Sequence, residues 1–189
     1  MKVDAADGPT HGVGTLQRAT LAAEIHDLYD GQGDGDRLLA AFRAAALYVP
    51  FAAGDAHRDP EGSAADANDG QDQAMCSGEA DGVRWLYAFT STTELERFAR
   101  TRAEAGTDPG WASGRIRYWT VLGSRLLDIA VPAAVAESRT PTGVAVDVGG
   151  IRPLLLPPLS GIVPDLVALD AAALVDRTSG TGPQNAGEA

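Results

Sequence analysis

The stretch from Ala53 to Gly82 constrains the fold most, because it gives a folded domain almost nothing to bury. It holds eight acidic residues against a single Arg, and only Met75 and Cys76 suit a core. Ordering a backbone costs roughly 1–2 kcal/mol per residue, which such a composition does not recover. A structureless loop of this length is uncommon inside a domain. We therefore predict that residues 53–82 form a disordered acidic insertion between two strands.

Large apolar residues are concentrated on either side of this insertion, in residues 15–52 and 83–177. Residues 1–14 and 178–189 are rich in Gly, Ala, Asp, Thr and Pro, so we expect disordered tails. A chain of 189 residues fits one domain. The sequence thus predicts one domain at residues 15–177, interrupted by the insertion.

The first part of this domain has the pattern of two helices. Leu21, Ile25 and Leu28 recur with the spacing of one helix face, and Glu24 falls on the face directed away from the core. After a glycine-rich turn, Asp36 is a plausible N-cap for a second helix. Two helices packed side by side are therefore expected before the first strand.

Three strands and one helix are expected next. Leu47–Pro50 is a short strand closed by its proline, and Val83–Phe89 has two apolar faces, as a central strand does. The spacing of Ser91–Glu94 is that of a capping box, which predicts a helix ending near Arg102. Ile116–Leu122 is expected to be another strand with two buried faces.

The last part completes a sheet with helical cover. A short helix from Gly123 is expected to end at Pro132, and Val144–Val148 to form a strand. A two-glycine turn then leads to Ile151–Leu156, whose proline lacks an N–H and so favours an edge strand. A final helix from Pro164 would dock its leucines on the sheet. The order predicts an α/β or α+β fold: a single domain with a mixed sheet covered by helices.

Charge and composition exclude several classes of partner. The formal net charge is −11, whereas nucleic acids and anionic membranes require a basic face. An N-terminus with acids in place of a basic start, and the lack of a run of about 20 apolar residues, predict a cytoplasmic protein. A single Cys excludes an internal disulfide and a zinc site built on paired thiolates. The expected partner is another protein, and the oligomeric state is left open.

Residues capable of chemistry do not assemble into a catalytic pattern. Asp30–Asp36 imitates the start of a calcium loop, but Ala41 occupies the position of its bidentate Glu, so an interhelical turn is expected. Cys76 lies in the most acidic stretch, which disfavours a thiolate. The three histidines show no metal-ligand spacing: His11, His26 and His57. We expect no enzyme, no metal and no cofactor.

Four residues of the expected strands are candidates for a binding face. Arg84, Arg117 and Asp147 each lie between apolar neighbours, and Trp119 adds aromatic area. One interpretation is cross-strand ion pairing beside a buried tryptophan. The other is a face that docks a protein, because Trp, Tyr and Arg dominate interfaces. Both interpretations stay open at this point.

Several longer phrases of the chain resemble a known family. Leu38–Pro50 runs from a helix into Tyr-Val-Pro, and Gly82–Ser91 runs from a strand into Phe-Thr-Ser. Gly123–Leu127 and Gly143–Gly149 are two further matching phrases. Together they resemble the N-terminal domain of the SseB family, which is named for enhanced serine sensitivity and also labelled type III secretion SseB-like. The resemblance extends over about residues 20–165.

The resemblance implies an α/β domain without catalytic residues to transfer, and an association with secretion or toxin–immunity genes. The family pattern has Asn-Pro-Gly after the later strand, where this chain has Asp147-Val148-Gly149. Our first hypothesis is therefore a non-enzymatic protein-interaction module that uses a sheet face or the edge strand Ile151–Leu156. A variant of it is an immunity or chaperone partner of a secreted protein. The alternative is a sensor or enzyme for an amino acid or other small anion, with a pocket near Arg84, Arg117 and Asp147.

Overall fold

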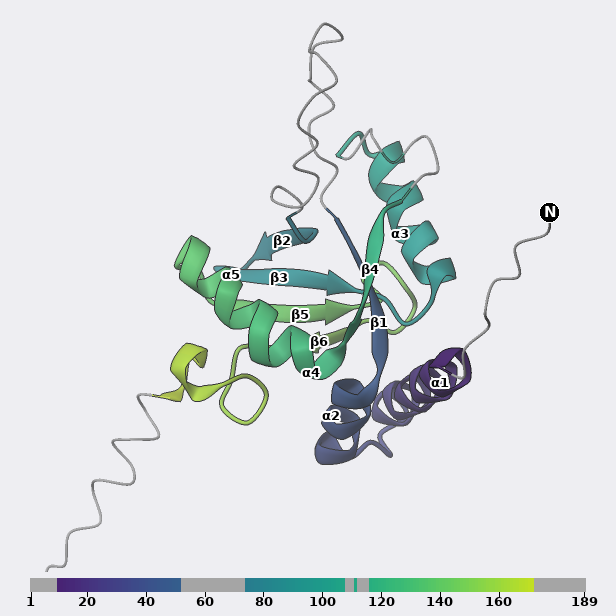
Figure 1. The fold of residues 1–189 in the computed structure, drawn as a ribbon, viewed down its shortest axis with the longest axis horizontal. Helices are drawn as coiled ribbons and strands as arrows, with labels where there is room; N and C mark the ends of the chain where they lie inside the picture. The colour runs from purple at the N-terminus through teal and green to yellow at the C-terminus, as the bar shows by residue number, and fades with distance from the viewer. Residues whose placement is uncertain (1–9, 52–73, 108–110, 112–115, 172–189) are drawn as a thin grey trace, which may run out of the picture.

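A computed structural model describes residues 10–51, 74–107, 111 and 116–171. Its main sheet has four strands in the order β2-β3-β5-β6 (Figure 1). The strands are β2 (Ser77–Ala80), β3 (Val83–Ala88), β5 (Thr142–Val146) and β6 (Leu154–Leu156). β3 and β5 run parallel, and the other two pairings are antiparallel. The chain is an α+β domain with a mixed sheet, as predicted.

The side chains of β3 alternate between two cores, which confirms the prediction of a central strand with two apolar faces. Leu86 and Ala88 belong to the larger core, which includes residues of α1, α2 and α5. Tyr87 and the following Phe89 pack on the opposite side, in a smaller core formed with α3. The period of two along a strand therefore places helices on both faces of the sheet.

A second sheet pairs β1 (Ala46–Pro50) with β4 (Tyr118–Leu122) in antiparallel orientation. It meets the main sheet where Tyr48 and Phe89 exchange both backbone hydrogen bonds, at 2.9 and 2.8 Å. Leu47 and Val49 of β1 are fully buried, whereas β4 is largely exposed. The prediction that residues 116–122 form a strand with two buried faces is wrong, because β4 is an edge strand outside the main sheet.

Helices α1 (Thr10–Tyr29) and α2 (Gly35–Ala44) lie side by side below β1 (Figure 1). Leu21 and Ile25 are buried as predicted, but Leu28 is 41% exposed. Glu24, which was expected to face away from the core, is buried because Arg37 of α2 binds its carboxylate at 2.7 Å. α1 also includes residues 10–14, which were assigned to a tail.

The N-cap of α2 is Asp34 and not Asp36, since the Asp34 carboxylate accepts the Arg37 N–H at 2.8 Å. Helix α3 (Thr92–Glu104) begins after Ser91, whose side chain accepts the Glu94 N–H as the capping-box spacing predicted. Leu95, Phe98 and Ala99 are its buried residues. The local signals therefore locate α3 more accurately than α2.

The helical segment after β4 is longer than expected. Gly123–Arg125 (α4), Leu126–Ala130 (a π-helical turn, η2) and Val131–Ser138 (α5) follow without a break. Pro132 does not end this rod, because the preceding turn is widened: the Val131 N–H bonds to the Leu126 carbonyl, five residues back. The helix end expected at Pro132 is therefore wrong.

The chain between β5 and β6 forms a longer loop than a two-glycine hairpin. A turn closes between Gly150 N–H and the Asp147 carbonyl at 2.9 Å, and β6 begins only at Leu154. β6 is an edge strand, as predicted. Of the predicted final helix, the described residues 164–170 contain only one 3-10 turn, η3 (Asp165–Val167), and Leu166 is 83% exposed. Hydrogen bonds from Leu169 N–H to Pro158 and from Ser160 N–H to Asp170 fold this segment back as a loop instead.

The predicted acidic insertion is wrong at its carboxyl-terminal end, residues 74–82. Cys76 is only 3% exposed, and β2 pairs with β3 over residues 77–80, so residues 74–82 belong to the fold. The remainder of the predicted insertion, residues 53–73, lies outside the described residues, as do residues 1–9 and 178–189 of the predicted tails. Among the described helices, none has the length and apolar character needed to cross a bilayer.

Candidate functional site

The carboxyl ends of the parallel strands β3 and β5 lie at the same edge of the main sheet. Asp147 follows β5 directly, and Thr90 lies two residues beyond β3. In open sheets with parallel strands, ligands bind at this edge, because the outgoing chains diverge there and leave a crevice. The edge is therefore the first place to look for a site.

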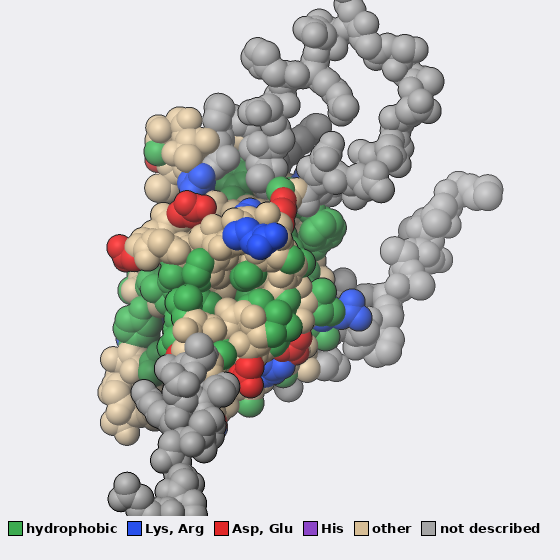
Figure 2. All heavy atoms as spheres, turned by 90° about the vertical axis from the view of Figure 1, so that its left-hand side faces the viewer, with side chains coloured by type: hydrophobic (Ala, Val, Ile, Leu, Met, Phe, Trp, Pro, Cys, Tyr) green, Lys and Arg blue, Asp and Glu red, His purple; other side chains and the backbone are tan. Residues whose placement is uncertain are grey.

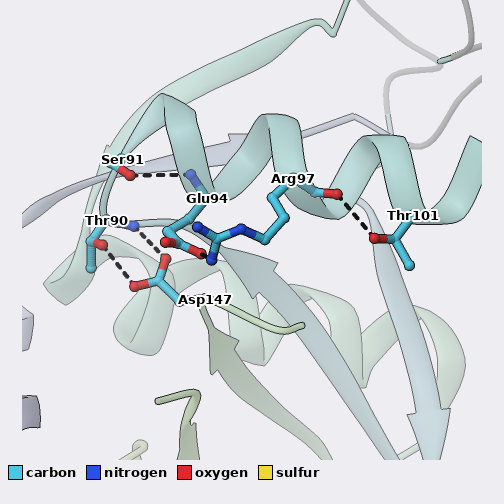
Figure 3. Close-up of polar contacts among 6 residues, drawn as sticks. All are labelled: Thr90, Ser91, Glu94, Arg97, Thr101 and Asp147. Atoms are coloured by element: carbon cyan, nitrogen blue, oxygen red, sulfur yellow. Dashed lines mark hydrogen bonds and ion pairs between the residues drawn. The ribbon is translucent and has the colours of Figure 1, made fainter. Parts of the chain in front are cut away.

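Asp147 connects the two strand ends through its carboxylate. Oδ1 accepts the Thr90 N–H at 2.9 Å, and Oδ2 accepts the Thr90 hydroxyl at 2.7 Å (Figure 3). The backbone φ of Asp147 is 51°, in the left-handed region where Asp and Asn are the best-tolerated residues after glycine. Both the turn and the side-chain bonds therefore favour an Asp or Asn here.

The first turns of α3 form one wall beside Asp147. The Glu94 carboxylate binds Arg97 at 2.7 Å, and the Thr101 hydroxyl donates to the Arg97 carbonyl one turn later (Figure 3). Gly150 of the β5–β6 loop approaches closely, since a Cβ there would lie 3.0 Å from a Glu94 carboxylate oxygen. Two carboxyl groups, those of Asp147 and Glu94, thus belong to the same wall.

Burial raises the pKa of Asp147 above its ordinary value, and the negative charge of Glu94 raises it further. The hydrogen bonds from Thr90 and the positive charge of Arg97 act in the opposite direction. The net direction is upward, so the environment disfavours the charged form of Asp147. A positive group brought to this wall would reverse that preference.

The opposite wall is one face of α1 together with Tyr48. Arg18, Ala22, Ile25 and His26 line it. The Arg18 guanidinium donates to the Ala46 carbonyl at 3.1 Å and lies 5.0 Å from the centre of the Tyr48 ring. Helix α1 therefore brings a cation to face the ends of β3 and β5.

The β5–β6 loop joins the two walls at one end. Arg152 binds Asp30 at 3.2 Å and also contacts the His26 ring, and the Tyr29 hydroxyl donates to the Pro153 carbonyl at 2.6 Å. These contacts attach the loop to the carboxyl end of α1. Ile151 of the same loop lines the space and is 90% exposed.

The enclosed space is a cleft of about 720 Å³, open on one side. Its charged lining consists of three arginines and two carboxylates, Arg18, Arg97, Arg152, Glu94 and Asp147, with His26 beside them. Its volume lies in the range of small-molecule sites, about 300–1,000 Å³. We call this space the carboxyl-edge cleft. In the residues described, no group of three or more metal-ligating side chains is found.

The structure does not bring all four predicted site residues together. Asp147 lines the carboxyl-edge cleft. Arg84 lies at the opposite end of β3, paired with Thr142, and donates to the Ser77 hydroxyl at 3.1 Å. Figure 2 views the side from which β3 and β5 start, where apolar side chains lie among a few charged ones. The expected pocket shared by Arg84, Arg117 and Asp147 therefore does not correspond to this cleft.

Arg117 and Trp119 do lie together, on the second sheet. The Trp119 ring packs edge-to-face on the Phe51 ring, with centroids 4.3 Å apart. The Arg117 guanidinium lies 5.5 Å from the centre of the Phe51 ring. Trp119 is 44% exposed, so the expectation of a buried tryptophan does not hold. We call Arg117 and Trp119, with Phe51 beneath them, the β4 surface; Tyr118 and Leu122 are also exposed but belong to the other face of the strand, where Tyr118 packs on Tyr48.

Sequence reasoning missed most of the cleft. Thr90 could have been predicted, because it lies between the end of a predicted central strand and the capping box of the next helix. Arg18 and Arg152 gave no signal, since they approach the cleft only through the packing of α1 and the loop. The Asp30–Asp36 turn joins two helices as expected, with Asp34 as cap, while Cys76 is a buried side chain and not a loop thiol.

The family model of the SseB protein N-terminal domain matches residues 21–159, well over half of the chain. The chain belongs to the SseB family. This confirms the family resemblance, and the match includes every strand of the domain and the whole β5–β6 loop. Neither the curated proteins nor the solved structures contain a match to the chain.

Proposed function

We propose that this SseB-family domain is a non-enzymatic protein-interaction module that docks another protein on its β4 surface. The observation that carries the proposal is the exposure of Arg117 and Trp119 together on one face of an edge strand. Tryptophan, tyrosine and arginine are the residues that most often contribute binding energy at interfaces. Trp119 and Arg117, both held in place by the Phe51 ring, form a preformed anchor.

The backbone of β4 adds a second means of recognition. β4 pairs with β1 on one side, and within the described residues no strand pairs with its outer side. An open edge of this kind accepts an extended segment from another chain through main-chain hydrogen bonds. The partner we propose is therefore a protein that adds a strand to β4 and places an acidic side chain near Arg117.

Other features of the proposal come from the sequence. An acidic chain in the cytoplasm that binds no nucleic acid and no membrane fits a protein partner. The SseB resemblance suggests a partner among secreted proteins, for which the domain would serve as an immunity protein or chaperone. The edge strand β6 is a less extensive alternative, because only Leu154–Leu156 are paired there.

Affinity purification from the native host, followed by quantitative mass spectrometry, tests the proposal. We expect one protein to be enriched by the wild-type chain and reduced at least tenfold by Trp119→Ala and by Arg117→Glu. Arg84→Gln is the matched control, because Arg84 lies on a different sheet and leaves the β4 surface unchanged. Thermal unfolding of each variant checks that the domain still folds.

Two outcomes would count against a different protein docked on the β4 surface. One is an enriched protein whose recovery is the same for all variants. The other is a Trp119-dependent homodimer seen in sedimentation, which would make a second copy of the chain the occupant. Recovery of the partner by both β4 variants but not by a Leu155→Glu variant would transfer the docking site to β6.

A further inference from the structure

One wall of the carboxyl-edge cleft carries two carboxylates together with Arg97, and the α1 wall carries Arg18. Asp147 and Glu94 belong to the wall formed by β5 and α3, and Arg18 belongs to the wall formed by α1. Glu94 is already bound to Arg97 at 2.7 Å, whereas the bonds to the Asp147 carboxylate come from the neutral groups of Thr90. The acidic wall thus keeps one carboxylate without a direct ion pair among the described residues.

The lining of the cleft includes apolar side chains and hydroxyl groups besides the charged residues. Ala22 and Ile25 line the α1 side, and Ile151 lines the loop side with 90% of its surface exposed. The side chains of Thr90, Ser91 and Thr92 add hydroxyl groups between them. A ligand body of mixed character fits such a lining better than a purely hydrophobic one.

Simple ions fit this lining poorly. A pure anion attracted by the arginines would meet Asp147 and Glu94, and a pure cation attracted by these carboxylates would meet Arg18 and Arg97. Like charges that line the same cleft repel a ligand of their own sign, and more so where water is partly excluded. A molecule that carries both charges satisfies both walls at once.

We propose that the carboxyl-edge cleft binds a small zwitterion, with its ammonium group at Asp147 and Glu94 and its carboxylate group at Arg18. The cleft of about 720 Å³ admits a free amino acid or a short peptide, which share this chemistry. The site is separate from the β4 surface, so it gives the domain a second ligand and not another part of the docking face. The raised pKa of Asp147 is consistent with a carboxyl group that lacks its cationic partner in the ligand-free state.

Isothermal titration calorimetry with two sets of probes tests the proposal. One set contains the common amino acids, tested singly, and the other contains dipeptides and tripeptides of alanine with free termini. We expect at least one probe to bind, and its N-acetylated and C-amidated derivatives, each with one charge removed, to bind at least tenfold more weakly. Binding by peptides only would identify a short peptide as the ligand, and binding by single amino acids would identify a free amino acid.

Three variants of the full chain locate the site. Asp147→Asn keeps an acceptor for the Thr90 N–H and Arg18→Gln keeps a donor, so both are expected to fold while losing at least tenfold in affinity. Arg84→Gln, at the other end of β3, is the control and should bind as the wild type does. Amide chemical shifts of residues 90–97 and 147–152 are expected to move on titration.

The proposal is overturned if no probe binds at up to about 10 mM, a concentration that would detect millimolar affinity. It is also overturned if the singly charged derivatives bind as well as the zwitterion, because the two walls would then not act together. Shifts confined to residues 117–122 would place the ligand on the β4 surface and equally contradict it.

Discussion

The two ends of the β3–β5 pair are built from the same strands but differ in what surrounds them. At the amino end, Gly143 is so closely packed that a Cβ would lie 2.6 Å from the Leu156 carbonyl oxygen and 2.9 Å from the Trp85 ring. At the carboxyl end, the chains leave toward α3 and the β5–β6 loop, and a cleft of about 720 Å³ separates these from α1. One end is closed by packing and the other is held open by polar contacts.

The difference shows how one pair of strands supports both stability and binding. Arg84 at the amino end finds its partner locally, in the Ser77 hydroxyl of the adjacent strand. Asp147 at the carboxyl end bonds across the strands to Thr90 and still faces the cleft. The amino end therefore stabilises the sheet, and the carboxyl end holds the groups available to a ligand.

The largest expected effect is at the closed end. Gly143→Ala should lower the free energy of unfolding by about 3 kcal/mol, because the added methyl group overlaps backbone and an aromatic ring in a packed core. Denaturant unfolding monitored by circular dichroism measures the change. Gly35→Ala is the control, since nothing lies within 4 Å of its Cβ position and a helix begins there. Equal stability of the Gly143→Ala protein and the wild type would show that the amino end is not closed by packing.

A smaller effect is expected at the open end. Asp147→Ala removes both acceptors of Thr90 and places an unfavourable residue at a φ of 51°, which should cost about 1–2 kcal/mol. The same unfolding experiment applies. Arg84→Gln should change stability by less than about 0.5 kcal/mol, because it removes one partly exposed contact. If Asp147→Ala and Arg84→Gln lowered the free energy of unfolding equally, the side-chain contacts at the two ends would contribute equally to stability.

The smallest effect concerns pH. The pKa of Asp147 is raised in the folded state above its ordinary value of 3.8, so this group favours folding fully below about pH 3.8, and the contribution is lost as pH rises through the folded pKa. Asp147→Asn imitates the protonated form at every pH. The variant should therefore be slightly more stable than the wild type at neutral pH and equal to it at the acidic end. A stability difference that grows as the pH falls would contradict the direction of the shift.

The sequence predicted the elements of this fold better than their arrangement. The alternation of Val83–Phe89 and the spacing of Ser91 and Glu94 depend on neighbours in the chain, and both predictions are confirmed. Alternation assigns a residue to a face of a sheet but not to an end of it. Arg84 and Asp147 were therefore grouped into one pocket, although the parallel pairing of β3 and β5 separates them.

Composition was also a poor guide where the backbone alone makes the contacts. β2 contains Gly78, Glu79 and Ala80, and it joins the sheet through ladder hydrogen bonds that need no apolar side chain. The cleft could not be predicted either, because Arg18 comes to it only when α1 packs against the rest of the domain, and the sequence gives no sign of this packing. By contrast, Leu166 and Leu169 had the spacing of a buried helix face, and yet both are exposed.

The π-helical turn at Leu126–Ala130 has a consequence for how this family domain tolerates length changes. The turn contains one residue more than an α-helical turn does, and Val131 and Ala134 beyond it point into the larger core. Deleting a single residue from it would restore ordinary helical geometry and leave the rest of the rod in nearly the same orientation, because the widened turn would become an ordinary one. Both side chains would then stay in the core, so a one-codon deletion here should be less damaging than one in an ordinary α-helical turn, which rotates the rest of a helix by about 100°.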